Sequence, residues 1–254
     1  MKSDTMRKGF RVLMLISLLV IGYSANALAN AIEHDYGDAP GYDWAWHSDA
    51  SWQRLGYKYD EEGSPNFDNV DPSDDGVFWS TDGGATWGHP DILLGQTVDF
   101  RFDMYKEEWG YHSYDAIKVW IDLNQDNVFD PSLEMIFEDK WYLSQTGGSA
   151  GVSTSFGTDP TDPIELIFPD PGVYWLRARV TCNLDINGDL SSFIPTGGVP
   201  GYQGWGYTCY VGQGEVEDWK LTVMPVPEPG SMLLFGSGLF AMGLFGRKKL
   251  FKKS

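Results

Sequence analysis

The stretch "IDLNQDNVFDPSLE" (121–134) carries oxygen-bearing side chains at alternate positions. Its candidate ligands are Asp122, Asn124, Asp126, Val128, Asp130 and Glu134. The first five fit positions 1, 3, 5, 7 and 9 of a calcium loop, in which alternate side chains and one backbone carbonyl surround a hard cation. The sequence therefore predicts a bound Ca²⁺. The alternative is a solvated turn in which Asp and Asn act only as turn formers.

Two details separate this loop from an EF-hand. Position 6 is Asn127 rather than Gly, although Asn tolerates the left-handed conformation that a sharp turn needs. Glu134 falls at position 13, one residue later than the distal acid of an EF-hand. Because the flanking residues alternate like strands, we expect the loop to connect the two strands of a β-hairpin.

Two further stretches are rich in acids. "LDINGDL" repeats the same spacing with Asp185, Asn187 and Asp189, but it has no later ligand, so a turn is at least as good an interpretation. "DNVDPSDDGV" contributes Asp68, Asp71, Asp74 and Asp75. Packing such carboxylates together costs repulsion, which a divalent ion relieves.

The stretch "GEVEDW" places three carboxylates on the last expected strand. Alternation along a strand puts Glu215 and Glu217 on one side with Trp219, and Asp218 on the other. We expect Glu217 and Asp218 to meet two early acidic segments through a cation or backbone amides, which would fasten the last strand to the first. The segments are "DYGDAP" (35–40) and "DDGV" (74–77), and the corresponding candidate metal cluster is Asp38, Asp74, Asp75, Glu217 and Asp218.

The sequence favours no catalytic role. It contains no G-x-S-x-G or H-E-x-x-H motif, and its four histidines have no zinc-like spacing. Two carboxylates could hydrolyse a glycoside, but 34 acids outside the two ends make any chosen pair uninformative, so a glycoside hydrolase ranks last. Lectin-like carbohydrate binding is the stronger alternative. Its candidate stacking residues, for which core or loop packing is the competing role, are Trp44, Trp46, Trp52, Trp109 and Trp205.

One motif resembles a feature of sialidase propellers. "STDGGATW" (80–87) fits the Asp-box, a hairpin stabilised by its own Asp and Trp that lies away from catalysis. A propeller needs several copies over a longer chain, and one copy is present here. We therefore expect a structural hairpin.

The elements that position these residues are β-strands. Apolar and polar residues alternate with a period of two, and helical periodicity is nearly absent. The expected strands are 97–105, 116–122, 133–139, 164–168, 172–180 and 216–223, with long surface loops and a few strands over 40–96. This pattern predicts an all-β fold, an antiparallel β-sandwich of jelly-roll or Greek-key type.

Both ends of the chain are typical of export signals. Residues 1–29 combine a basic start, an apolar run and "ANALA", which predicts a secretory signal peptide recognised by the Sec machinery. Residues 226–254 combine Pro227, Glu228 and Pro229, an apolar run that predicts a short transmembrane helix, and a basic tail. One folded domain is expected between them, over residues 30–225.

That central domain is strongly acidic. It has nine basic and 34 acidic residues, a formal net charge near −25. Such a surface repels nucleic acid and anionic lipid and attracts multivalent cations. The pair Cys182 and Cys209 predicts one disulfide in an oxidising compartment, with two unpaired thiols as the alternative.

Two family resemblances follow from these motifs. Pro-Glu-Pro, the apolar run and the basic tail together resemble the PEP-CTERM sorting signal of Gram-negative bacteria. This resemblance implies transient anchoring in the inner membrane, processing by an exosortase, and delivery to the cell surface or an exopolysaccharide matrix. "DYGDAP", "DDGV", "KVWIDLNQDNVFD" and "GEVEDWKLTV" resemble GEVED-domain proteins in their order. That resemblance implies a surface or adhesion module with surface partners and no established catalysis.

Overall fold

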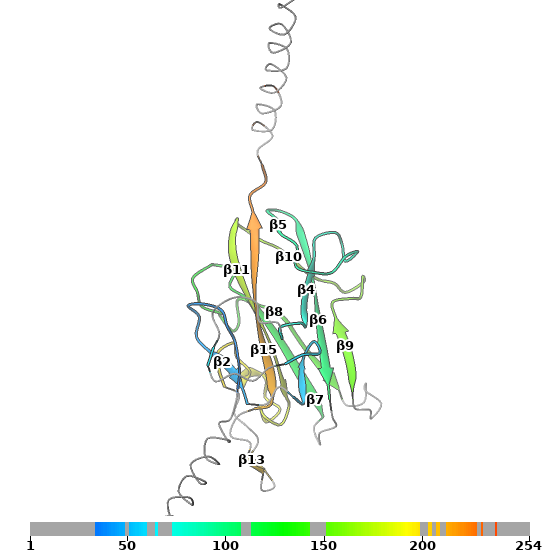
Figure 1. Ribbon diagram of the computed structural model, residues 1–254, viewed down its shortest axis with the longest axis vertical. Coiled ribbons are helices and arrows are strands. Elements are labelled where there is room, and N and C mark those ends of the chain that lie inside the picture. Colours follow the sequence, from blue (N-terminus) through cyan, green and yellow to red (C-terminus); the bar gives the residue numbers. More distant parts are fainter. Residues whose placement is uncertain are drawn as a thin grey trace, which may run out of the picture.

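The computed structural model describes residues 34–48, 51–59, 64–65, 73–107, 113–142, 151–198, 203–204, 207–208, 212–227, 230 and 237. The folded part is built of strands and turns, which confirms the all-β class (Figure 1). No helix among these residues is long and apolar enough to cross a membrane. The expected signal peptide and nearly all of the expected C-terminal helix lie outside them.

The larger sheet has the strand order β5-β15-β11-β7-β8. Its strands are β5 (Ile92–Leu93), β15 (Gly214–Met224), β11 (Gly172–Cys182), β7 (Tyr114–Ile121) and β8 (Met135–Tyr142). The last strand of the domain, β15, pairs antiparallel with β11 along ten residues, from Gly214 to Val223. β5 runs parallel to the final residues of β15, so the end of the domain is held on both sides.

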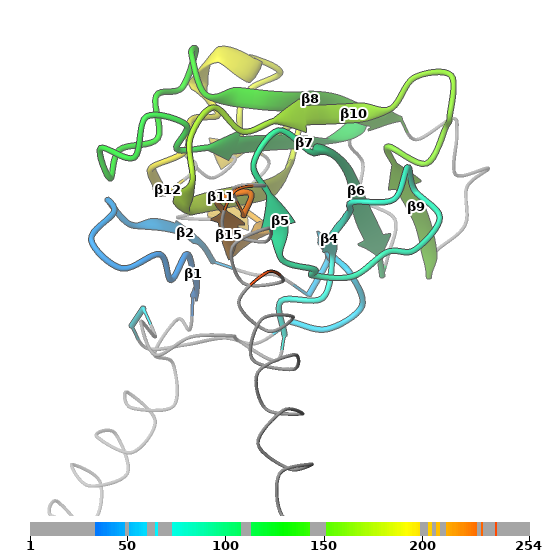
Figure 2. The ribbon, with the colours of Figure 1, turned by 90° about the horizontal axis from the view of Figure 1, so that it is seen from above.

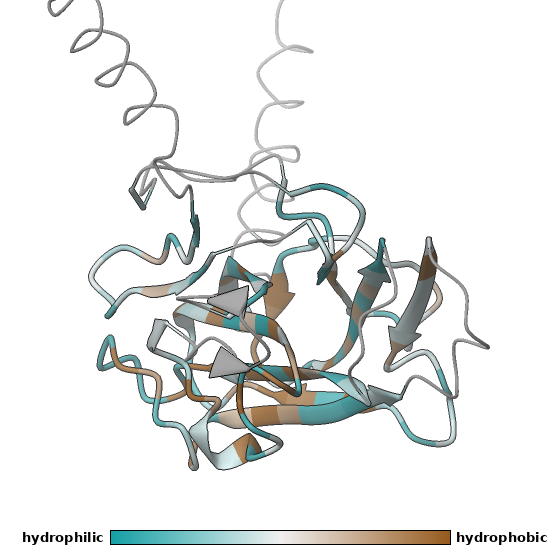
Figure 3. Ribbon diagram, turned by 90° about the horizontal axis from the view of Figure 1, so that it is seen from below, coloured by the Kyte–Doolittle hydropathy of each residue, from teal (hydrophilic) through white to brown (hydrophobic). Residues whose placement is uncertain are grey.

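The smaller sheet is built around β6 (Thr97–Lys106). Its other strands are β3 (Gln53–Leu55), β4 (Val77–Ser80), β9 (Val152–Phe156) and β10 (Ile164–Ile167), all antiparallel to β6. Val98, Phe100, Phe102 and Met104 are fully buried, as the alternation predicts. Brown, hydrophobic bands and teal, hydrophilic bands both occur along the strands (Figure 3).

The two sheets pack face to face around one apolar core (Figure 2). The smaller sheet contributes side chains such as Phe100 and Phe102, and the larger sheet contributes Val119, Leu176 and Leu221. The fold is therefore a β-sandwich.

A third layer covers the outer face of the larger sheet. It consists of a three-stranded sheet and the 3-10 turn η2 (Leu190–Ser192). The strands of this sheet are β1 (Asp35–Tyr36), β2 (Ala45–His47) and β12 (Gly197–Gly198). A separate hairpin is formed by β13 (Gln203–Gly204) and β14 (Tyr207–Thr208). Phe193 packs near Trp120 and Ala116 on this face. Because β7 is covered on both sides, all eight of its residues are buried.

Two expectations about the strands need correction. The strand expected at 133–139 begins only at Met135, because Leu133 is 81% exposed and Glu134 belongs to the preceding loop. β9 was not expected, since "VSTSF" has too few apolar residues to stand out. The other five expected strands lie where the alternation places them, to within two residues.

Candidate functional site

The loop between β7 and β8 folds around its own polar side chains. Asp122 accepts hydrogen bonds from the amides of Asp126 (3.2 Å) and Asn127 (2.9 Å). The Asn124 side-chain oxygen accepts the same Asp126 amide at 2.9 Å, and the Asn124 amide group donates to Asp126 at 3.0 Å. Asp126 also accepts the Val128 amide at 2.9 Å. The first three predicted ligands are thus gathered on one turn of the chain.

Glu134 closes this loop. Its carboxylate accepts the amides of Leu123 (2.9 Å) and Asn124 (3.3 Å) with one oxygen and that of Asp130 (2.8 Å) with the other. Burial raises the pKa of Glu134, against the effect of these three amides. Glu134, one position later than the distal acid of an EF-hand, therefore has a structural role here, because its carboxylate connects the end of the loop to its beginning.

The remaining predicted ligands face different environments. Asp130 accepts the amides of Ser132 (2.8 Å) and Leu133 (2.7 Å), and these bonds lower its pKa. The Val128 side chain is exposed. Asn127 has a φ of 66°, which confirms the left-handed turn expected of it.

The loop concentrates negative charge without a basic partner. None of its carboxylates, Asp122, Asp126, Asp130 and Glu134, forms an ion pair with a described Lys or Arg. Asp122 is fully buried and accepts the Tyr42 hydroxyl at 2.6 Å. Burial, followed by this hydrogen bond, raises the pKa of Tyr42. Within the described ranges, no three His, Cys, Asp or Glu side chains form a group that could hold a metal.

The Glu217 side chain of β15 meets the segment that precedes β4. One carboxylate oxygen accepts the amides of Asp75 (2.9 Å) and Gly76 (2.7 Å), and the other accepts the Trp219 indole at 2.9 Å. The residue is fully buried, and burial raises its pKa to about 7. The expected contact with "DDGV" is therefore present and made through backbone amides.

Asp218 points to the other side of β15, as alternation predicts. It forms a bidentate ion pair with Arg177, at 2.8 and 2.7 Å, from the directly paired position of β11. The same carboxylate accepts the Ala39 amide at 2.7 Å. Asp218 thus binds "DYGDAP" to the outer face of the larger sheet.

Asp35 and Glu215 complete this set of contacts. Asp35 accepts the Val216 amide at 2.6 Å, and Glu215 accepts the Leu55 amide from β3. Burial raises the pKa of Glu215 well above its usual range, and the nearby carboxylates of Asp35, Glu217 and Asp74 add to the effect. We call the contacts of Asp35, Glu215, Glu217 and Asp218 the closure contacts, since they join the last strand to four earlier segments.

Three of the four closure carboxylates, Glu215, Glu217 and Asp218, lie within a recognisable unit of sequence. Residues 116–222, from β7 to β15, match the GEVED domain. This chain contains a GEVED domain. The match begins later than the first motif at residue 35, so β1 to β6, which supply partners for the closure contacts, lie outside it.

The segment behind the GEVED domain also matches a known signal. Residues 225–249 match the PEP-CTERM protein-sorting motif. The motif implies export, membrane-anchored sorting to the cell surface and processing by an exosortase. It starts one residue after β15 ends at Met224.

Other comparisons give only distant likenesses. No curated protein matches the chain. Solved structures that resemble it include the C-terminal domain of wzt, with 13% identity over 59% of this chain and 72% of that one and a TM-score of 0.32. Another is the CARDB domain of the PF1109 protein from Pyrococcus furiosus in complex with di-metal ions. It has 10% identity over 55% of this chain and 89% of that one, with a TM-score of 0.26.

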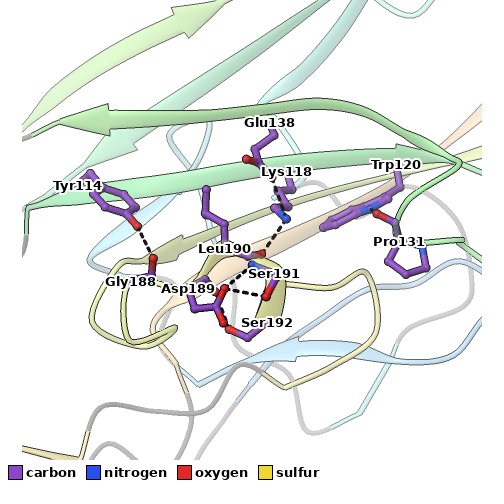
Figure 4. Close-up of polar contacts among 10 residues, drawn as sticks. All are labelled: Tyr114, Lys118, Trp120, Pro131, Glu138, Gly188, Asp189, Leu190, Ser191 and Ser192. Carbon is purple, nitrogen blue, oxygen red and sulfur yellow. Dashed lines mark hydrogen bonds and ion pairs between the residues drawn. The ribbon is translucent and has the colours of Figure 1, made fainter.

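The second acidic repeat of the GEVED domain forms a turn (Figure 4). Asp189 caps η2 by accepting the Ser191 amide at 2.9 Å and hydroxyl at 2.7 Å. Asp185 accepts the Gln213 amide at 2.9 Å, and Asn187 has a φ of 51°. Lys118 reaches over from β7 to donate to the Leu190 carbonyl at 2.8 Å. With these contacts, the stretch from Asp185 to Asp189 forms a structural turn.

The Asp-box forms a hairpin, as expected. Asp82 accepts the Ser80 hydroxyl at 2.6 Å, and the amide and hydroxyl of Thr86 at 2.9 and 2.6 Å. These hydrogen bonds lower the pKa of Asp82 to about 2. The hairpin is closed by a bridge between Trp79 and Gly88.

The predicted stacking tryptophans lie in different settings. Trp44 is 56% exposed, whereas Trp46 packs against His34, with ring centroids 4.8 Å apart. Trp52 is half-buried and lines a surface cavity. Trp109 and Trp205 lie outside the described residues, as do Asp68 and Asp71 of the third acidic stretch.

The predicted disulfide stays a prediction. Among the described residues Cys182 is a buried free cysteine whose sulfur accepts the Leu184 amide at 3.3 Å. Burial raises the pKa of this thiol to about 12. Cys209 lies outside the described residues.

Sequence reasoning missed two buried arginines of β11. Arg177 donates to the carbonyls of Asp43 (2.7 Å) and Pro195 (3.0 Å) besides its ion pair. Arg179 donates to the Ile194 carbonyl at 2.6 Å and lies beside His47. Burial, with Arg177 nearby, lowers the pKa of Arg179 to about 9. "RAR" in a strand, two residues apart, is the signal that both arginines share one face.

Proposed function

We propose that this exported chain is a structural and adhesive module of the bacterial extracellular matrix. This matrix surrounds a Gram-negative cell, and the partners of the chain within it are exopolysaccharide and other surface proteins. In this proposal the inner membrane holds the chain transiently through its C-terminal segment. The proposal assigns no catalytic activity, and it adds Ca²⁺ as a stabilising ion.

One observation carries the proposal: the strand nearest the sorting motif is paired on both of its edges and bound by side-chain contacts on both faces of its sheet. Force applied through the C-terminal segment acts first on β15. That strand is paired with β11 over ten residues, and its side chains bind segments on both faces of the larger sheet. A domain that links a surface anchor to an external partner needs this arrangement, because the anchor pulls on its last strand.

The charge distribution supports the calcium part of the proposal. Five of the nine basic residues of the domain are buried, namely Arg54, Lys106, Lys118, Arg177 and Arg179. The excess of carboxylates therefore lies at the surface, where it attracts divalent cations. In the loop after β7, Asp122 and Asn124 keep lone pairs beyond those used by the amides, so both can still bind a hard cation.

A matrix assay in the producing bacterium tests the proposal. Deletion of the chain should reduce matrix cohesion and the attachment of cells to it, and expression of the full chain should restore both. A chain with Pro227→Ala, Glu228→Ala and Pro229→Ala should not restore them, because the sorting motif is broken. Unchanged cohesion and attachment after deletion would reject the matrix role.

Carbohydrate binding is a second candidate function. Trp44 presents an exposed indole beside a cavity of about 430 Å³ lined by Tyr42, Asp43, Thr196 and Gly197. An exposed indole next to hydroxyl and carboxylate groups suits the apolar face and the hydroxyls of a sugar. Weaker retention of the Trp44→Ala chain on the producer's own polysaccharide would support this function.

A further inference from the structure

The outer face of the smaller sheet carries a cluster of tyrosines around a single arginine. Arg54 of β3, Tyr105 of β6 and Ser153 of β9 are directly paired across three strands, so their side chains share one face. That face is opposite to the core, because the neighbouring Met104 points inward. Tyr57 and Tyr59 follow β3 directly and are 62% and 41% exposed.

The arginine sets the positions of the rings. Its guanidinium carbon lies 5.0 Å from the ring centroid of Tyr59 and 4.4 Å from that of Tyr105. The Tyr57 ring lies 5.1 Å from the Tyr105 ring, and its hydroxyl is 3.3 Å from the Ser153 hydroxyl. Three rings from two segments, together with Ser153 of β9, therefore share one framework.

Arg54 is itself fixed. It donates to the carbonyls of Tyr57 (3.0 Å) and Ser51 (2.9 Å), and it pairs with Glu107 at 3.3 Å. The guanidinium is almost wholly buried, whereas the Glu107 carboxylate is half exposed. Since the ring framework is ordered before a ligand arrives, binding would cost little side-chain entropy.

A cavity of about 490 Å³ opens beside this framework. Its described lining is Ser51, Trp52, Arg54, Tyr59 and Glu107. The volume is in the range of small-ligand sites, and the lining combines two aromatic rings with a few fixed polar groups. Such a combination offers flat apolar contact together with hydrogen-bond acceptors.

We propose that this cavity and the adjoining tyrosines form a saccharide-binding site. This inference rests on the second proposed function, carbohydrate binding, and gives it a location distinct from Trp44. Tyr57 and Tyr59 stack on the apolar faces of sugar rings, and Glu107 accepts hydrogen bonds from sugar hydroxyls. The ligand class is a neutral glycan, because the domain's net charge near −25 repels a polyanion.

Binding of defined oligosaccharides tests this site. The full-length chain, purified in a detergent without a sugar headgroup, is titrated with neutral hexaoses of glucose, mannose and galactose and followed by calorimetry. We expect at least one hexaose to bind, and Tyr57→Ala and Tyr59→Ala each to weaken it on the order of tenfold. Glu107→Gln should also weaken it, since it removes the charged acceptor without changing the size of the side chain.

Two matched variants separate this site from its alternatives. Tyr142→Ala removes an exposed tyrosine from β8 of the other sheet and should leave binding unchanged. Binding that is lost in Trp44→Ala but kept in Tyr57→Ala and Tyr59→Ala would overturn this site and leave the carbohydrate function standing. Absence of binding to all three hexaoses would overturn the proposed site, and the producer's polysaccharide would then test the function separately. The melting temperature of each variant verifies that it is folded.

Discussion

The closure contacts and the loop after β7 both gather carboxylates, but they use them differently. In the closure contacts, the amides that bind Glu217 and Asp218 come from residues 141 to 179 positions away along the chain. In the loop, the amides that bind Asp122 and Glu134 come from residues at most 11 positions away. Distant partners make the first group part of the tertiary fold. The local amide partners make the second group part of a turn, in which only the Tyr42 hydroxyl binds Asp122 from a distant segment among the described contacts.

Removal of Asp218 should have the largest effect of the substitutions that test this difference. Asp218→Ala leaves Arg177 buried without its ion-pair partner, which costs about 3–5 kcal/mol of unfolding free energy. Urea denaturation followed by tryptophan fluorescence measures the loss. Lys58→Ala, at the exposed pair with Asp75, is the control and should cost less than about 1 kcal/mol. Equal losses in both variants would contradict the assigned role of Asp218.

The closure contacts should also depend on pH through Glu217. Its pKa is raised from 4.5 to about 7, so the folded protein takes up this proton as the pH falls through 7, before the unfolded chain does. The stabilisation is therefore full below pH 4.5 and lost as the pH rises through 7, on the order of 3 kcal/mol.

The variant Glu217→Gln isolates this effect from other titrating groups. The unfolding free energy of the variant minus that of the natural chain should be larger at pH 8 than at pH 5. His47, whose pKa burial lowers, acts in the opposite direction in both proteins and cancels from the difference. Thermal melting at both pH values gives the comparison. A pH-independent difference would show that Glu217 stays ionised in the fold.

Calcium should act on the loop rather than on the closure contacts. At a hundredfold excess over its dissociation constant, a bound ion adds about 2.7 kcal/mol to the unfolding free energy. We expect the melting temperature to rise with Ca²⁺ and fall with EDTA. Asp126→Asn should weaken the response, whereas Asp159→Asn, in another Asp turn with local amide contacts, should retain it. No response to Ca²⁺ or EDTA in the natural chain would leave the solvated turn as the correct interpretation.

The smallest effect is expected at the Asp-box. Asp82→Ala removes the carboxylate that accepts hydrogen bonds from Ser80 and Thr86, but these bonds are local, within four residues of Asp82, and those to Thr86 are exposed. The melting temperature should fall slightly and the response to Ca²⁺ should be unchanged. A fall as large as that of Asp218→Ala would mean that this hairpin also takes part in closing the domain.

The sequence predicted what depends on local pattern. Alternation placed the core strands and assigned Glu217 and Asp218 to opposite sides of β15. Spacing identified the loop after β7 and the Asp-box. The third layer could not be predicted, because β1 and β2 are only two and three residues long and are held by contacts with β15 and β11. Arg177 was missed for the same reason, since its partners at Asp43 and Pro195 are far away in sequence.

Amide hydrogen exchange tests the central claim, that the carboxylates of "GEVEDW" close the fold. The amides of Ala39 and Gly76 lie in short connecting segments and are bound by Asp218 and Glu217. We predict that they exchange as slowly as the amides of β11, because both would open only when the domain unfolds. The amides of Ser132 and Thr161, bound by exposed carboxylates in local turns, are the internal reference. Exchange of Ala39 and Gly76 at the rate of that reference would contradict the account.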